Sequence, residues 1–221
     1  MTLLTHDPAP PADDPVLSAG DPVLLADARS ETVPFPYHHL PETFPAETAA
    51  RLRETFPETG FTKVTGQDPD KTYAMWTRPL HPEPAGELPE PWQEFVREVT
   101  GPRYRAGLAA LTGLPLESCP VEVNLWRYPP DCWLDPHVDK PGKLVTHVFY
   151  FNEPWSESWG GNLLLLGSQD RGDVVRRVAP LHNSSVVLVR GETSWHAVES
   201  ARPGNPGAVR LSAQVIFHRP E

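Results

Sequence analysis

The sequence VRLSAQVIFH at residues 209–218 decides the fold, because its side chains alternate in character with a period of two. The apolar residues on one face are Val209, Leu211, Ala213, Val215 and Phe217. The opposite face carries Arg210, Ser212 and Gln214, together with Ile216. Alternation of this kind predicts a β-strand with one face in a core. The polar face could point to solvent or to the interior of a barrel, and alternation alone does not choose between them.

Other short runs with strand character precede this one, and turn residues such as Pro129-Pro130 and Gly160-Gly161 separate them. These runs cover residues 121–128, 144–151, 162–166, 174–178 and 184–190. Extended pieces near residues 135 and 195 bring the expected number of strands to about eight. Helices do not alternate with these strands, which argues against a parallel α/β sheet. We therefore predict a mostly β protein with packed helices, a double-stranded β-helix of the jelly-roll or cupin-like type.

The N-terminal half has a different sequence pattern, with helical periodicity in place of strand alternation. Apolar spacing and proline breaks predict helices near residues 46–56 and 90–99, and a third that contains Tyr104 and ends at Gly113. Residues 60–88 are expected to be a loop with an aromatic cluster at 73–76. The predicted organisation is a flexible Pro-rich arm (1–32), a helical and loop region that supports or covers the site (33–120), and a jelly-roll catalytic core (121–221), all within one domain.

Composition limits the classes of partner. The 221 residues carry a formal charge of −10, which argues against binding a nucleic-acid backbone. The sequence has no run of 18 apolar residues and no secretory leader, so neither a membrane span nor export is expected, and a cytoplasmic location follows. The two cysteines, Cys119 and Cys132, are expected to be reduced thiols. Four of the 19 basic residues are lysines (63, 71, 140 and 143), and the excess of arginine suggests a bacterial source. Nothing in the sequence indicates the oligomeric state.

The motif with the clearest chemistry is His137-Val138-Asp139. In an extended segment the two side chains point to the same side, so an imidazole and a carboxylate converge. Alone, this pattern fits a solvated His–Asp pair equally well. His196, which follows the apolar strand at 184–190, adds a second imidazole. Two histidines and one carboxylate form the facial triad of non-haem Fe(II) oxygenases, which leaves open positions for a co-substrate and dioxygen.

A second group of residues has the chemistry to bind an anion. Fourteen residues after His196, Arg210 and Ser212 begin the last strand. A guanidinium can hold a carboxylate through two parallel hydrogen bonds, and a serine hydroxyl can add a third. This spacing favours placing the polar face of residues 209–218 in the interior of the barrel.

Several motifs in residues 121–218 together resemble the Fe(II)/2-oxoglutarate dioxygenases, in particular the prolyl-hydroxylase-like branch. The motifs are Tyr128-Pro129, His137-Val138-Asp139, residues 145–152 (VTHVFYFN), residues 159–163 (WGGNL), His196 and Arg210-Leu211-Ser212. The resemblance implies that His137, Asp139 and His196 ligate Fe(II). It also implies that Arg210 binds the distal carboxylate of 2-oxoglutarate, that Ser212 and Tyr150 assist it, and that Tyr128 and Leu163 form the pocket walls.

The resemblance implies a reaction as well. With Fe(II), 2-oxoglutarate and O2, the enzyme would hydroxylate an unactivated C–H bond and release succinate and CO2; desaturation, epoxidation and cyclisation remain open. We expect a small-molecule substrate, such as an amino acid or a biosynthetic natural-product intermediate. The alternatives are a peptidyl or protein prolyl hydroxylase and, from a different class, a non-catalytic cupin-like metal-binding module.

The alternation of side chains along the strands and the aromatic residues in the loops suggest where the substrate would bind. The candidate contacts are Asn124, Trp126, Gln214, Trp133, Trp76 and Trp195. Of these, Trp126 could equally belong to the core, and Trp195 could simply pack at the rim. His147 lies on the face of its strand opposite to Tyr150, so we expect it to be a packed histidine and not a ligand.

Overall fold

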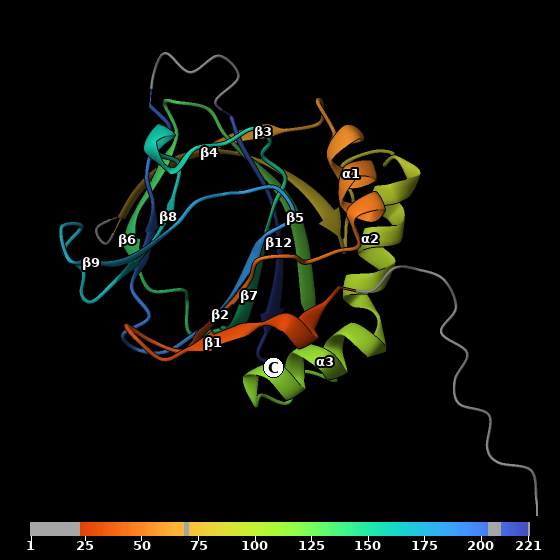
Figure 1. The fold of residues 1–221 in the computed structure, drawn as a ribbon, viewed down its shortest axis with the longest axis horizontal. Helices are drawn as coiled ribbons and strands as arrows, with labels where there is room; N and C mark the ends of the chain where they lie inside the picture. Colours follow the sequence, from red (N-terminus) through yellow and green to blue (C-terminus); the bar gives the residue numbers. More distant parts are fainter. Residues whose placement is uncertain (1–22, 69–70, 203–208, 221) are drawn as a thin grey trace, which may run out of the picture.

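The computed structural model describes residues 23–68, 71–202 and 209–220, which form one curled antiparallel sheet with three α-helices on one side (Figure 1). The strands of the N-terminal half are β1 (Arg29–Glu31), β2 (Tyr37–Leu40), β3 (Thr62–Asp68) and β4 (Lys71–His81). The later strands are β5 (Val121–Tyr128), β6 (Trp133–His137), β7 (Lys143–Tyr150), β8 (Leu163–Leu166), β9 (Val174–Val178), β10 (Ser185–Val189), β11 (His196–Val198) and β12 (Arg210–His218).

The order of the strands explains how the sheet curls. It runs β1-β2-β10-β7-β12-β5-β4-β6-β11-β8-β9, with β3 paired to β4. The long strands β12 and β5 pair over eight residues, from Arg210 opposite Tyr128 to Phe217 opposite Val121. Strands β6, β11, β8 and β9 lie across the curl from this wall (Figure 1). The result is the half-barrel of a jelly roll, as the sequence predicts.

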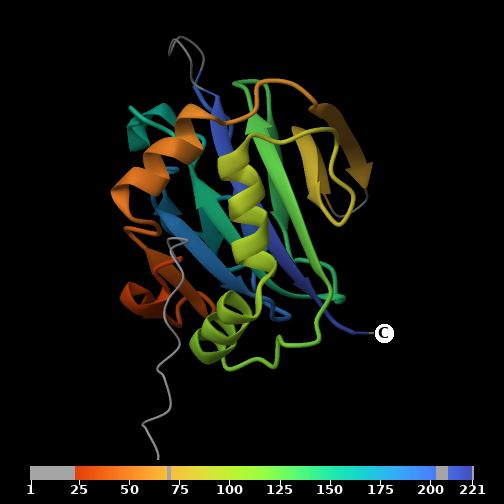
Figure 2. The same ribbon diagram turned by 90° about the vertical axis from the view of Figure 1, so that its right-hand side faces the viewer.

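Three helices cover the outer face of the long strands (Figure 2). They are α1 (Ala46–Glu54), α2 (Glu90–Thr100) and α3 (Pro102–Thr112), and two short 3-10 helices are η1 (Leu25–Asp27) and η2 (Glu157–Trp159). Prolines suit the first turn of a helix because the amide hydrogen they lack has no partner there, and Pro102 begins α3. Gly113 ends α3 with φ at 71°, a left-handed conformation that glycine adopts without steric cost.

The sheet separates two apolar clusters. The larger one lies between the helices and the outer face of the sheet, where Trp92 and Leu108 of the helices pack with Phe149 and Val215 of the strands. The other cluster lies on the inner face and includes Tyr128, Val148, Leu163 and Leu188. β12 supplies residues to both faces: Ala213, Val215 and Phe217 join the outer cluster, while Arg210 and Gln214 line an inner cavity. The alternation predicted for residues 209–218 is therefore confirmed, and its polar face points inward.

The structure corrects the expectations for the N-terminal half. Residues 60–88 are not a loop, because most of them form the hairpin of β3 and β4, and β4 pairs with both β5 and β6. The eight strands expected from residue 121 onward are present as β5 to β12, whereas β1 to β4 were not expected and bring the total among the described residues to twelve. The predicted arm extends too far, because η1 and β1 lie within residues 23–32, and β1 pairs with β2. Residues 1–22 of the predicted arm lie outside the described residues.

Within the part of the chain that the structure describes, no helix combines the length and apolar character needed to cross a membrane. Cys119 and Cys132 are both buried free cysteines.

Candidate functional site

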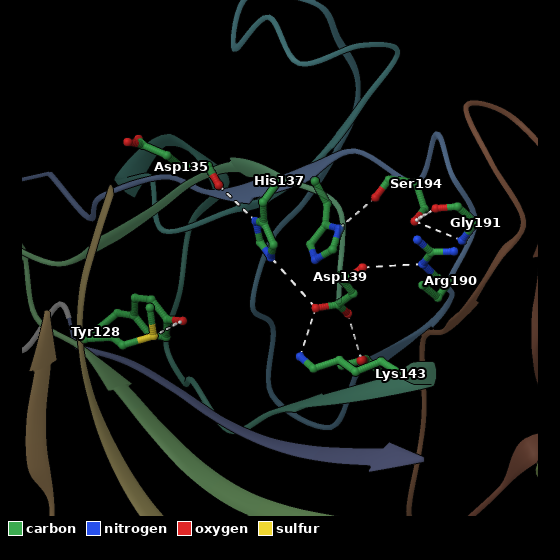
Figure 3. Close-up of polar contacts among 11 residues, drawn as sticks. Tyr128, Asp135, His137, Asp139, Lys143, Arg190, Gly191 and Ser194 are labelled. Atoms are coloured by element: carbon green, nitrogen blue, oxygen red, sulfur yellow. Dashed lines mark hydrogen bonds and ion pairs between the residues drawn. The ribbon is translucent and has the colours of Figure 1, made fainter. Parts of the chain in front are cut away.

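Three potential metal ligands come together where β6 and β11 meet. His137 is the last residue of β6, His196 is the first residue of β11, and the two residues are paired across the strands. Asp139 follows β6 by two residues, and one ligand atom from each of the three side chains lies within 4.8 Å of the others. His137 Nε2 is 3.9 Å from Asp139 Oδ1 (Figure 3). The structure thus gathers the three residues that the sequence analysis selected, and a divalent cation could be held among them.

Backbone hydrogen bonds orient both imidazoles. Nδ1 of His137 lies 2.9 Å from the carbonyl oxygen of Asp135, and Nδ1 of His196 lies 2.9 Å from that of Ser194. A carbonyl oxygen can only accept, so Nδ1 carries the hydrogen and Nε2 keeps its lone pair. Burial is the main cause that lowers the pKa of both histidines, and the positive charge of Lys71 acts in the same direction. Both rings are therefore neutral at pH 7, which is the form that ligates metals.

Asp139 is held in its ionised form. Its Oδ1 lies 2.9 Å from Lys143 Nζ (Figure 3). Its Oδ2 accepts a hydrogen bond from Thr146 Oγ1 at 3.0 Å. Burial alone would raise the pKa of Asp139, but the neighbouring His196 and the Lys143 ammonium outweigh it and hold the pKa well below its usual range. A buried carboxylate that stays charged is a suitable hard oxygen ligand for a divalent cation.

Arg210 occupies the inner face of the sheet at the start of β12, only 1% exposed. Its guanidinium stacks on two aromatic rings, 4.9 Å from the centre of Tyr128 and 5.1 Å from that of Tyr150. Nη1 donates to Ser212 Oγ at 3.2 Å, whereas Nε and the Tyr150 hydroxyl lack a hydrogen-bond partner of regular geometry. Among the described residues, no carboxylate pairs with this cation. A buried guanidinium in this state fits a carboxylate-bearing ligand.

One cavity of about 320 Å³ connects the two groups. Its wall includes His137, Asp139 and His196, as well as Arg210, Tyr128 and Leu163. Ser212 and Tyr150 contact Arg210 but are not among the residues that line the cavity. Burial raises the pKa of Tyr128 to about 12, and its hydroxyl donates to the Met75 sulfur at 3.2 Å, so it stays protonated. The arrangement can hold a cation and a carboxylate in one enclosed space.

The six residues predicted to contact a substrate divide into two groups. Trp126 and Gln214 line the cavity, as expected from their positions on β5 and β12. Asn124 points to the same side of β5 but lies beyond the cavity, where its amide nitrogen contacts Glu122 Oε1 at 2.5 Å.

The remaining three tryptophans lie away from the cavity. Trp76 lines a separate cavity of about 330 Å³, because it lies on the face of β4 opposite to Met75 and Thr77. Trp133 Nε1 donates to Thr72 Oγ1 at 3.2 Å. Trp195 packs against the cluster of Leu164, Leu166 and Ala197. The structure thus does not bring Trp76, Trp133 or Trp195 to the site.

One wall of the cavity was not predicted from the sequence. The β3–β4 hairpin contributes Val64, Lys71, Tyr73, Met75 and Thr77 to the lining. The period-two pattern of Tyr73, Met75 and Thr77 was visible in the sequence. It was not used because the segment was interpreted as a loop.

Comparison with known proteins gives a family match, a curated relative and several similar solved structures. Residues 123–218 match the family described as the 2OG-Fe(II) oxygenase superfamily. The chain is 30% identical over 127 residues to "Prolyl 3-hydroxylase OGFOD1" of Xenopus laevis, a match over 56% of this chain and 24% of that protein. The chain therefore spans about a quarter of the length of this curated relative.

Solved structures agree on the fold. A prolyl-4-hydroxylase from Pseudomonas putida superimposes with a TM-score of 0.63 at 23% identity, covering 83% of this chain and 92% of that one. An oxidoreductase of the 2OG-Fe(II) oxygenase family from Burkholderia pseudomallei has a TM-score of 0.61 at 18% identity, covering 84% and 86% of the two chains. At these identities the likeness supports the jelly-roll fold alone.

Proposed function

We propose, starting from the membership of residues 123–218 in the 2OG-Fe(II) oxygenase superfamily, that this chain is a hydroxylase. The superfamily uses Fe(II), 2-oxoglutarate and O2. In the proposed reaction one oxygen atom enters a C–H bond of the substrate and the other enters succinate, while CO2 is released.

A single observation carries this proposal: a cluster of two histidines and one aspartate opens into the same cavity as a buried arginine that no described carboxylate neutralises. His137, Asp139 and His196 would hold Fe(II) through Nε2, Oδ1 and Nε2 respectively. Arg210 would bind the distal carboxylate of 2-oxoglutarate, with the hydroxyls of Ser212 and Tyr150 beside it. A non-catalytic metal-binding module of cupin type would have no use for such an arginine at the far end of the metal cavity.

When bound, the iron and 2-oxoglutarate supply the oxidising chemistry, and the residues of this chain supply binding and orientation. The carbonyl oxygens of Asp135 and Ser194 fix the two imidazole rings. Lys143 and Thr146 hold the Asp139 carboxylate in one direction. Tyr128 and Leu163 confine the co-substrate, which limits the access of water.

For the substrate we propose a small molecule that enters between the β3–β4 hairpin and the loop before β7. Trp126 and Gln214 would contact it from the sheet. A prolyl residue in a peptide or protein is the second candidate, because the relatives from Xenopus laevis and Pseudomonas putida bear the names of prolyl hydroxylases. The cavity of about 320 Å³ is of a size that holds 2-oxoglutarate and a group as large as one amino-acid residue.

The test begins with the purified chain, Fe(II) and 2-oxoglutarate under 18O2. Succinate that carries one labelled oxygen is the expected product. If no labelled succinate forms in any of the reactions, the oxygenase proposal is refuted. Free amino acids and prolyl peptides are then added separately. The true substrate should accelerate succinate formation and gain one labelled oxygen atom, which decides between the two substrate classes.

A further inference from the structure

Four side chains form a row across the inner face of the sheet. They are Arg210 of β12, Tyr128 of β5, Met75 of β4 and Val64 of β3, and all four line the cavity that holds the ligand cluster. Arg210 is paired with Tyr128, and Met75 is paired with Val64. The register of β4 against β5 places Met75 beside Tyr128. The row therefore connects the buried guanidinium of Arg210 to the β3–β4 hairpin.

The central contact of this row is a hydrogen bond. The Tyr128 hydroxyl donates to the Met75 sulfur at 3.2 Å, and both side chains are buried (Figure 3). Burial raises the pKa of Tyr128 to about 12, so the hydroxyl keeps its hydrogen and remains a donor. A thioether is a weak acceptor, but a buried hydroxyl that loses its acceptor is destabilised. The bond to Met75 therefore fixes the far end of the Tyr128 side chain.

The ring held by this bond supports Arg210. The guanidinium lies 4.9 Å from the centre of the Tyr128 ring, within the range of a cation–π contact. Strand pairing holds the Tyr128 side chain at its backbone end, and the Met75 sulfur holds it at the hydroxyl end. A cation–π contact requires the cation to lie over the face of the ring, so a tilt of the ring would move the favourable position of the guanidinium. The direction of Arg210 thus depends on a residue two strands away.

Packing alone does not require a methionine at this position. Met75 belongs to the inner apolar cluster, and a leucine of similar volume would fill the same space without an acceptor for the Tyr128 hydroxyl. We propose that Met75 is a positioning residue for the co-substrate. Its sulfur holds the Tyr128 hydroxyl, and the Tyr128 ring holds Arg210 in the orientation that receives the distal carboxylate of 2-oxoglutarate. This inference rests on the proposed function and adds the β3–β4 hairpin to the co-substrate anchor.

Isotope labelling tests the inference in the unaltered chain, because Met75 is the only methionine after residue 1. The protein is produced with methionine that carries 13C at the methyl group and is loaded with Zn(II), a diamagnetic substitute for Fe(II). The spectrum of Met75→Leu identifies the Met75 signal. Addition of 2-oxoglutarate should shift this signal, and the shift should be much smaller in Tyr128→Phe. A shift that is absent from the parent chain, or equally large in Tyr128→Phe, would overturn the inference.

Calorimetric titration of the Zn(II) forms with 2-oxoglutarate measures the energetic effect. Met75→Leu should raise the dissociation constant by about 3- to 10-fold, the effect of losing one neutral hydrogen bond. Tyr128→Phe removes the other partner of the same bond, so Met75→Leu should cause no further loss in the double variant. If the two fold-changes multiply instead, Met75 acts through packing and the inference is wrong. An unchanged or lower dissociation constant in Met75→Leu would also contradict it.

Trp76→Ala is the matched control. It truncates the next residue of β4, which lines a separate cavity, and should leave the dissociation constant of 2-oxoglutarate unchanged. An increase as large as that in Met75→Leu would show that any disturbance of β4 weakens binding, which would overturn the inference. If 2-oxoglutarate does not bind to the Zn(II) form of the parent chain, the proposed function itself is refuted. That result is distinct from normal binding that Met75→Leu leaves unchanged.

Discussion

The carbonyl oxygen of Asp135 lies 2.9 Å from Nδ1 of His137, so one residue of β6 orients the imidazole of another. The side chain of Asp135 reaches in two further directions. Its Oδ1 accepts a hydrogen bond from Arg171 Nη1 at 2.7 Å, and its Oδ2 accepts one from the Thr72 backbone amide at 3.1 Å. Asp135 thus connects the His137 strand to the β3–β4 hairpin and to the turn before β9.

We expect Asp135→Ala to weaken Fe(II) binding by about 10-fold or more, because groups that orient a ligand typically affect metal affinity by 10- to 100-fold. The backbone bond to His137 remains possible in this variant, but the strand loses two of its anchors. Fe(II) titration measures the change. Asp131→Ala is the control, since Asp131 contacts Lys63 at the surface. Equal Fe(II) affinity in the two variants would show that Asp135 has no positioning role.

The three proposed ligands give the most direct prediction. His137→Ala or Asp139→Ala should abolish substrate-dependent turnover, because two remaining ligands hold Fe(II) poorly. Asp139→Asn preserves the shape of the side chain and should fail for the same reason, since the amide is neutral. Metal analysis after gel filtration and succinate assays check these outcomes. A full complement of iron with normal activity in both alanine variants would refute the assignment.

Arg210→Ala should raise the 2-oxoglutarate requirement far more than it alters substrate affinity. Truncating one partner of a buried charge pair costs about 2–5 kcal/mol, which corresponds to roughly 30-fold to several thousand-fold in affinity. Arg210→Lys should restore only part of the lost affinity for 2-oxoglutarate, because an ammonium cannot form the two parallel hydrogen bonds of a guanidinium. If the 2-oxoglutarate titration curves of Arg210→Ala and the parent protein superimpose, the distal carboxylate of 2-oxoglutarate is bound by another cation.

Two tryptophans on neighbouring strands provide a matched pair. Trp126 lines the cavity that holds the ligand cluster, whereas Trp76 lines the separate cavity beside Phe61 and Arg127. Trp126→Ala should lower the ratio of hydroxylated product to succinate, because a misplaced substrate leaves 2-oxoglutarate turnover uncoupled. Trp76→Ala should leave that ratio unchanged. If Trp76→Ala reduced the ratio as strongly as Trp126→Ala, the proposed substrate position would be wrong.

Acid sensitivity should depend on His147. This side chain is fully buried between the Tyr104 hydroxyl at 2.7 Å and Ser185 Oγ at 2.8 Å. Burial lowers its pKa to about 3, whereas a histidine in the unfolded chain has a pKa near 6.5. The unfolded state therefore binds the extra proton first, and the free energy of unfolding should fall as the pH decreases from about 6.5 to about 3.

Denaturant unfolding at a series of pH values measures this effect. His147→Gln keeps hydrogen-bonding capacity but cannot titrate, so its unfolding free energy should fall less steeply over that pH range. Its overall stability at pH 7 is expected to be lower, because the glutamine does not reproduce the packing of the imidazole against Phe149. The same pH slope in both proteins would assign the acid sensitivity to other groups.

The part of the fold after residue 120 was predictable because its patterns are local. Side-chain character alternates over most of β5 and β12, so residues 121–128 and 209–218 were recognised with nearly the observed boundaries. The helices were recognised for a similar reason, since prolines and Gly113 mark their ends. The His137-Val138-Asp139 motif, together with the resemblance of the later motifs to a known family, selected His137, Asp139 and His196, which the structure gathers within 4.8 Å.

The β3–β4 hairpin was not predictable by the same means. β4 is stabilised by pairing with β5, about 50 residues later, and that partner is invisible in a local pattern. Its sequence also contains Pro79 and the buried Arg78, whose guanidinium donates to the carbonyl oxygens of Thr59 and Glu87. Proline and arginine both lower the apparent strand character of the segment. Because the hairpin was missed, its contribution to the cavity was missed too.

The two faces of β12 restrict how such a protein can change in evolution. Arg210 and Gln214 line the cavity, while Ala213 and Val215 pack beneath the helices. Inserting or deleting one residue in this strand would exchange the two sets, exposing apolar side chains to the cavity and burying a guanidinium under the helices. Point substitutions within strands and length changes in loops are therefore the routes open to new substrate preferences. Loops away from the His137–Asp139–His196 cluster are where length differences between descendants of this fold should accumulate.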